Sequence, residues 1–227
     1  MEVSEKTIEF LKNYADIQKT MMFSPGQHQQ TVSVGEDFFS KVKLEENIPQ
    51  EFGIYDLPQF ISCLSFIDKP NLKFLDKHLM ISDAAGIENI KLPFSDPRHI
   101  VKPAGSLEKP EPIVTFTLSR NILSKIKKSS AILGLNDCVF KKSGNSFEVS
   151  VLDTEMDKEE DSQTWSRELD CEVFSEKDFT FIFDISTFKM MDGDYEVTCN
   201  APLTHFRNLE CDLEYWVAMH STSIYGE

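Results

Sequence analysis

The chain has 227 residues and a formal net charge of −15, from 23 lysines and arginines against 38 aspartates and glutamates. Hydrophobic residues make up 41% of it, enough for a packed interior, which excludes a chain that is disordered throughout. So acidic a protein repels a phosphate backbone at long range, and its overall field therefore argues against nucleic-acid binding.

The helices and strands can be predicted from the spacing of apolar residues. A helical period covers residues 5–17, with Ser4 as the N-cap, and a clearer one covers residues 119–133, with Ser119 as the cap. Two shorter helices are predicted at residues 57–66 and 185–191. Alternation of polar and apolar residues predicts strands near residues 31–34, 41–44, 72–75, 78–81, 147–152, 179–184, 195–199 and 213–219.

An internal repeat divides the chain into two similar halves. Residues 54–60 and 182–188 share the order isoleucine, aromatic, aspartate, aliphatic, two variable positions and phenylalanine. In each half a longer helix precedes this motif, and the aspartate is placed to cap a short helix. Prolines cluster between the halves and indicate an extended linker. We expect an α+β protein with domains over residues 1–95 and 113–227 and a connector over residues 96–112.

Motifs for catalysis or metal binding are absent from the sequence. The five histidines have no metal-ligand spacing, and no nucleophile turn, phosphate loop or dinucleotide fingerprint occurs. Residues 153–161 have acidic residues at alternate positions, but Lys158 stands where a calcium loop needs glycine, so we expect a solvated loop. Cys63 is interpreted as a structural thiol. We therefore expect no enzyme activity, no metal and no cofactor.

Cysteine usage and hydropathy indicate where the protein resides. The five cysteines are widely spaced and form no CxxC pair, which is typical of reduced thiols. The sequence shows neither a signal peptide nor an apolar run long enough to span a bilayer. We expect a cytoplasmic protein with no membrane partner.

Positive charge is concentrated on the predicted helix at residues 119–133. Arg120, Lys125, Lys127 and Lys128 give this segment a charge of +4, so the rest of the chain carries −19. Arg120, Lys127 and Lys128 lie opposite the apolar stripe of the helix, and Lys125 lies at the edge of that face. A solvated face, a membrane-surface helix and a phosphate-facing helix all remain open, although the stripe lacks the aromatic residues typical of membrane-surface helices.

Several short segments, taken together in their order and spacing, resemble one known family. They include residues 11–15 (Leu-Lys-Asn-Tyr-Ala), 54–57 (Ile-Tyr-Asp-Leu), 96–97 (Asp-Pro), 188–190 (Phe-Lys-Met) and 215–218 (Tyr-Trp-Val-Ala). The chain is similar across nearly its whole length to the sliding clamps, or DNA polymerase processivity factors, of T-even-like bacteriophages. No single segment is specific by itself.

The resemblance implies a homotrimeric ring with two clamp-type domains per subunit. Antiparallel sheets would lie outside and short helices would line a central channel that encloses double-stranded DNA without reading its sequence. The implied partners are the replicative DNA polymerase, an ATP-driven clamp loader and late-transcription factors, in the cytoplasm of an infected bacterium. The alternative is an acidic monomeric interaction protein, for instance a nucleic-acid mimic.

The resemblance also assigns roles to residues. Ile100 and Val101 on the connector are expected to take part in docking partner proteins. Edge strands near residues 86–92 and 166–172 are expected to close the ring. The expected DNA-facing side chains are Lys6, Lys12, Arg120, Lys125, Lys127, Lys128 and Lys189.

Overall fold

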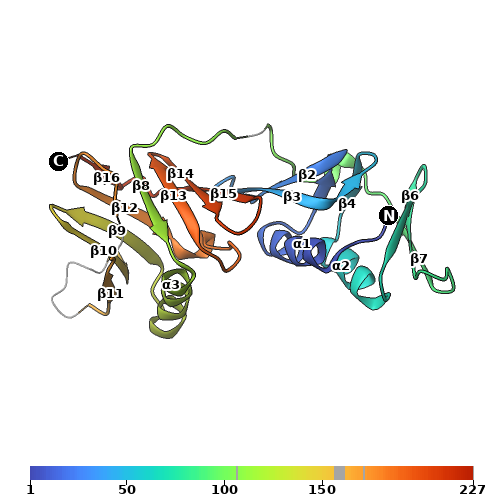
Figure 1. Ribbon diagram of the computed structural model, residues 1–227, viewed down its shortest axis with the longest axis horizontal. Coiled ribbons are helices and arrows are strands. Elements are labelled where there is room, and N and C mark those ends of the chain that lie inside the picture. The colour runs from blue at the N-terminus through green and yellow to red at the C-terminus, as the bar shows by residue number, and fades with distance from the viewer. Residues whose placement is uncertain (106, 156–161, 171, 227) are drawn as a thin grey trace. The chain divides into compact units, whose positions relative to one another are not determined.

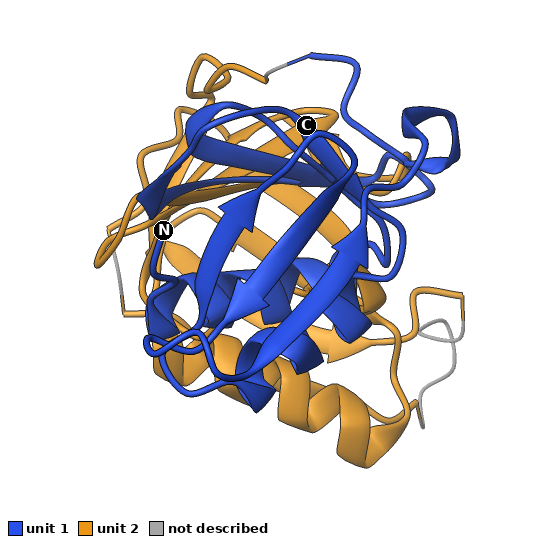
Figure 2. Cartoon of the chain, turned by 90° about the vertical axis from the view of Figure 1, so that its right-hand side faces the viewer, with its two compact units in different colours: residues 1–106 blue, residues 107–227 orange. Residues whose placement is uncertain are grey.

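A computed structural model describes residues 1–105, 107–155, 162–170 and 172–226 of the chain. The chain divides into two compact units, residues 1–106 and 107–227, shown in different colours in Figure 2. This division falls inside the predicted connector at residues 96–112; the finer domain boundaries remain a prediction. Each unit contains its own aromatic core and is described separately.

Unit 1 combines two helices with three small antiparallel β-structures (Figure 1). Helix α1 packs against α2, and β1 pairs with β4, β2 with β3, and β6 with both β5 and β7. A single 3₁₀ turn, η1, follows β7. The elements are α1 (Glu5–Ile17), β1 (Met21–Phe23), β2 (Gly26–Val32), β3 (Phe38–Ile48), β4 (Phe52–Ile54), α2 (Leu57–Phe66), β5 (Asn71–Phe74), β6 (His78–Ser82), β7 (Asn89–Pro93) and η1 (Pro97–His99).

Side-chain caps determine where the two helices of unit 1 begin. The hydroxyl of Ser4 accepts a hydrogen bond from the backbone N–H of Thr7 (3.2 Å), and Asp56 accepts one from Gln59 (2.9 Å). The core beside them is aromatic, since the ring of Phe23 stacks on that of Phe52 with centroids 4.5 Å apart. Both predicted helices, at residues 5–17 and 57–66, are confirmed.

Among its described residues, unit 2 contains two antiparallel sheets and one α-helix (Figure 1). Strands β15, β14, β13 and β8 lie side by side in that order, and β11, β10, β9, β12 and β16 form the other sheet. The elements are β8 (Val114–Leu118), α3 (Arg120–Leu133), β9 (Asp137–Ser143), β10 (Ser146–Leu152), β11 (Trp165–Glu168), β12 (Phe179–Asp184), η2 (Ile185–Thr187), β13 (Tyr195–Asn200), β14 (Leu203–Asn208), β15 (Leu213–Ala218) and β16 (Ile224–Tyr225).

Aromatic side chains join the two sheets of unit 2 into one core. The ring of Phe116 on β8 lies 5.1 Å from that of Phe140 on β9 and 5.0 Å from that of Phe147 on β10. Helix α3 covers this core with Ile122, Leu123 and Ile126 and ends at Gly134, whose φ of 69° gives a left-handed C-cap. The predicted helix at residues 119–133 is confirmed.

The predicted fourth helix, at residues 185–191, is wrong. Asp184 does cap a turn, accepting a hydrogen bond from the N–H of Ser186 (2.8 Å), but the turn is the short 3₁₀ helix η2. The N–H of Lys189, which a longer helix would direct to residue 185, donates instead to the carbonyl of Thr187 (2.8 Å). The N–H of Met191 donates to the Tyr215 hydroxyl (3.1 Å), and the Met191 carbonyl accepts from the Tyr195 hydroxyl (2.6 Å). The repeat therefore keeps its cap but loses its helix.

The remaining sequence predictions concern the acidic loop, the cysteines, membrane-spanning helices and metal sites. In the predicted acidic loop at 153–161, residues 156–161 lie outside the description, as does Cys171. The described cysteines are free thiols. Within the described ranges, no helix is long and apolar enough to cross a membrane, and no group of three metal-ligating side chains converges.

Candidate nucleic-acid interface

Helix α3 separates its charges from its apolar side chains. Ile122 and Ile126 are buried in the core of unit 2, whereas Arg120, Lys125 and Lys128 are exposed. This separation follows from the 3.6-residue period of the helix, which places the buried stripe opposite the cations. A solvent-facing surface rich in lysine and arginine can bind phosphate oxygens without reading bases.

The four predicted cations of α3 are not equivalent, and Lys127 is the clearest exception. Its ammonium donates a hydrogen bond to the carbonyl of Met190 (2.7 Å) and lies 3.7 Å from Asp192. Burial lowers the pKa of Lys127, against the opposing effect of the Asp192 carboxylate. Lys127 therefore ties α3 to the segment that follows η2, and it is half-buried rather than presented to solvent.

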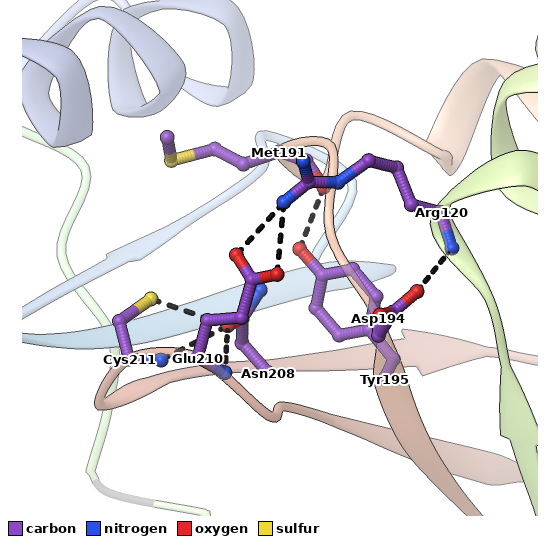
Figure 3. Close-up of polar contacts among 7 residues, drawn as sticks. All are labelled: Arg120, Met191, Asp194, Tyr195, Asn208, Glu210 and Cys211. Carbon is purple, nitrogen blue, oxygen red and sulfur yellow. Dashed lines mark hydrogen bonds and ion pairs between the residues drawn. The ribbon is translucent and has the colours of Figure 1, made fainter.

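Arg120 is exposed, but it has a carboxylate partner (Figure 3). One terminal nitrogen of its guanidinium, Nη2, lies 3.0 and 2.8 Å from the two carboxylate oxygens of Glu210. Its backbone N–H donates to Asp194 (2.6 Å), which places a negative charge at the N-terminus of α3, where the helix dipole favours it. The side-chain oxygen of Asn208 accepts a hydrogen bond from the backbone N–H of Glu210 (2.8 Å) and so holds Glu210 in place.

Lys125 and Lys128 are the uncompensated cations of α3. In the part of the chain that the structure describes, neither has a carboxylate within the 4.0 Å ion-pair distance. The predicted Lys189 is exposed and lies in the same unit, after η2. The predicted Lys6 and Lys12 belong to unit 1, on the exposed face of α1, where Glu5, Glu9 and Asp16 are also exposed. The strongest positive surface on a helix is therefore that of α3.

The predicted docking residues on the connector have different surroundings. Ile100 is buried, and its terminal methyl lies 2.2 Å from where a Cβ would stand on Gly53, so the missing side chain of glycine makes room for it. Val101 donates its N–H to the hydroxyl of Thr20 (3.2 Å) and keeps 39% of its surface exposed. Ile100 therefore seats the connector on unit 1, and Val101 is the more accessible of the pair.

Sequence reasoning missed the attachment of the connector to unit 2. The indole N–H of Trp216 donates to the carbonyl of Glu108 (3.0 Å), and Asn200 donates to that of Glu111 (3.0 Å). The ammonium of Lys109 lies 2.9 Å from the carboxylate of Glu196. A buried tryptophan needs an acceptor for its indole N–H, so Trp216 signals that some partner exists. The sequence does not show which one, because the acceptor is a backbone carbonyl 108 residues away.

Glu196 makes this attachment sensitive to acid. Hydrogen bonds from Arg207, and then from Lys109, lower the pKa of Glu196 to about 2 from an ordinary value of 4.5. A carboxyl group with a lowered pKa in the folded state binds protons more readily when unfolded. Stability should therefore fall as the pH drops from about 4.5 towards 2, and stay constant above that window as far as this group is concerned.

We expect Glu196→Gln to remove this part of the pH dependence. The free energy of unfolding, measured with urea between about pH 2.5 and about pH 5, should fall less steeply in the variant, with a difference of about 1 kcal/mol across the window after solvent screening. Equal slopes for the two proteins would show that the Glu196 ion pairs contribute nothing to stability.

Comparison with known proteins supports the resemblance found in the sequence. A family model described as DNA polymerase processivity factor matches residues 3–90. The sliding clamp of Vibrio phage KVP40 is 27% identical over 223 residues, which cover 96% of this chain and 98% of that protein. These matches confirm the predicted resemblance to the sliding clamps of T-even-like bacteriophages. The sliding clamps of phages T4 and RB69 are 24% and 22% identical, each over 87% of this clamp and 86% of the relative.

A solved structure confirms the clamp fold. The proliferating cellular nuclear antigen of Entamoeba histolytica superposes with a TM-score of 0.66 at 14% identity, covering 94% of each chain. The predicted α+β fold with two clamp-type domains is thereby confirmed. Sliding clamps are processivity factors of DNA replication and not enzymes, so the family also confirms the prediction that this clamp is non-enzymatic.

Proposed function

We propose that three copies of this chain close head to tail into a ring that encircles double-stranded DNA and tethers the replicative polymerase. The observation that carries the DNA-binding part is the outward basic face of α3, with Lys125 and Lys128 unpaired among the described residues of a chain whose net charge is −15. Contacts from lysine and arginine to phosphates are sequence-independent, as sliding requires. The acidic remainder repels DNA from the rest of the surface.

Two exposed strand edges support ring closure. Strand β7 is an edge of its three-stranded sheet, and β11 is an edge of its five-stranded sheet. They overlap the segments predicted to form the subunit interface. Two different edges on one chain allow each copy to pair its β7 with the β11 of the next, which is the head-to-tail arrangement that generates rings.

The hydrogen-bond pattern shows which backbone groups these edges present. In the β6–β7 ladder, the N–H of Asp83 donates to the carbonyl of Glu88, and the N–H of Phe94 donates to that of Lys77. Residues of β7 that hydrogen-bond to β6 alternate with residues whose N–H groups face outward, and the latter are Asn89 and Lys91. In the β10–β11 ladder, Leu169 donates to Phe147, which leaves Ser166 and Glu168 facing outward. Each edge therefore offers two outward N–H groups for pairing.

The proposal includes the partners that the resemblance implied. Short hydrophobic segments of the polymerase, of an ATP-driven clamp loader and of late-transcription factors would dock beside the connector near Val101. Val101 supports this placement, because its side chain is accessible while its backbone N–H fixes the connector to Thr20 of unit 1. The clamp would act in the cytoplasm of the infected bacterium.

Mass and processivity test the proposal together. Size-exclusion chromatography with light scattering should give a mass three times that of the 26.0 kDa chain. With a clamp loader and polymerase of the same phage type, the protein should lengthen the products made on a long primed template. A single-chain mass together with no effect on product length would contradict the ring and favour the alternative, an acidic monomeric nucleic-acid mimic.

A further inference from the structure

Carboxylates from two separate loops converge on the basic face of α3. Asp192 precedes β13 and approaches Lys127, whereas Glu210 lies between β14 and β15 and binds Arg120. Figure 3 shows Glu210 reaching the guanidinium from the loop that follows Asn208. Two of the four cations of α3 therefore already have an anionic neighbour before any phosphate arrives.

The Arg120–Glu210 pair is built to exchange partners. The two side chains are 54% and 57% exposed, and an ion pair so well solvated contributes only about 0–1 kcal/mol. Of the guanidinium nitrogens only Nη2 contacts Glu210, and a guanidinium binds phosphate as well as carboxylate, so a passing phosphate can displace Glu210. The Lys127–Asp192 pair differs, because Lys127 is also held by the carbonyl of Met190.

We propose that Glu210, and to a lesser degree Asp192, limit how tightly α3 binds DNA. Glu210 is a positioning residue: it acts through Arg120, which must give up one anion to bind another, and its charge repels the phosphate. The gain from each phosphate contact is thereby reduced, and the contact is broken as easily as it is formed. This inference rests on the proposed DNA-facing role of α3, and it assigns the pair a purpose, which is to keep the ring mobile.

Four forms of the full-length protein test the role of Glu210: wild type, Glu210→Gln, Arg120→Gln and the double variant. Affinity for a fluorescent linear duplex is measured at a series of salt concentrations. Glu210→Gln should bind about three- to tenfold more tightly at low salt, and the plot of log affinity against log salt should steepen by about one. Arg120→Gln should bind no more tightly than wild type, and the gain from Glu210→Gln should be clearly smaller in that background, because no guanidinium remains to be released.

Two further measurements separate this role from a structural one. On rings loaded onto DNA, Glu210→Gln should diffuse more slowly, which loss of a merely structural contact would not cause. Glu196→Gln is the control: it removes one negative charge from an ion-pair group of unit 2 outside α3, that with Arg207 and Lys109, and should leave the salt slope unchanged. Asp192→Asn should give a smaller gain than Glu210→Gln, because Lys127 stays bonded to Met190.

The outcomes distinguish failure of the inference from failure of the proposed function. If reversing Lys125 and Lys128 leaves DNA binding unchanged, α3 does not face DNA and the proposed function is wrong. If that reversal weakens binding while Glu210→Gln behaves like Glu196→Gln, only the inference is overturned. An equal gain from Glu210→Gln with and without Arg120 would also overturn it, because the effect would then be one of total charge.

Discussion

Lys91→Pro should convert the proposed trimeric ring into single chains and abolish processive synthesis. Lys91 lies in the middle of β7, opposite Met80 of β6, at a position whose backbone N–H faces away from that partner. Proline removes this donor and places its ring where the neighbouring strand would pair, so it blocks strand addition at an edge. The ladder between β6 and β7 keeps its bonds, because residue 91 donates none to β6.

Matched variants make this test specific to the strand edge. Lys91→Ala removes the same charge and keeps the N–H, so it should remain trimeric. Ser166→Pro on β11 should dissociate the ring from the opposite edge, with Ser166→Ala as its control. Light scattering gives the mass, and circular dichroism checks that the chain stays folded. A folded Lys91→Pro protein that still runs as a trimer would rule out β7 as the interface.

Reversing the charge of Lys125 and Lys128 together should weaken DNA binding about 10- to 100-fold at low salt, because two phosphate contacts are replaced by repulsion. Both side chains are exposed on α3, and neither has a carboxylate partner among the described residues. The free energy of unfolding should therefore change by less than about 0.5 kcal/mol, and the trimer should remain intact. Duplex binding, light scattering and urea unfolding measure the three quantities.

Lys127→Glu should behave differently from that pair. It leaves the Met190 carbonyl without its donor and places a second carboxylate beside Asp192, so we expect a loss of about 1–3 kcal/mol of stability. A variant that combines Arg120, Lys127 and Lys128 would therefore mix folding with DNA binding. If Lys127→Glu were as stable as wild type and lowered DNA binding as much as the exposed pair does, Lys127 would count as a DNA contact after all.

Three α-helices could be predicted from the sequence because their determinants are local. Ser4, Asp56 and Ser119 each cap a helix by bonding a backbone N–H three residues on, and the apolar period follows within a few turns. The fourth helix was predicted from the same signal at Asp184 and failed. The N–H of Met191, which the helix would need, donates to the hydroxyl of Tyr215, 24 residues away, and a local pattern cannot reveal such a partner.

The charge of α3 shows the same division between local and distant causes. The sequence by itself determined that four cations gather on one face of an amphipathic helix in an acidic chain, because helical period and residue type settle that locally. Only the tertiary structure decided which of them remain available to DNA. Asp192 and Glu210 each lie at least 65 residues along the chain from the cation that they contact. The folding of β13, β14 and β15 brings both carboxylates beside α3.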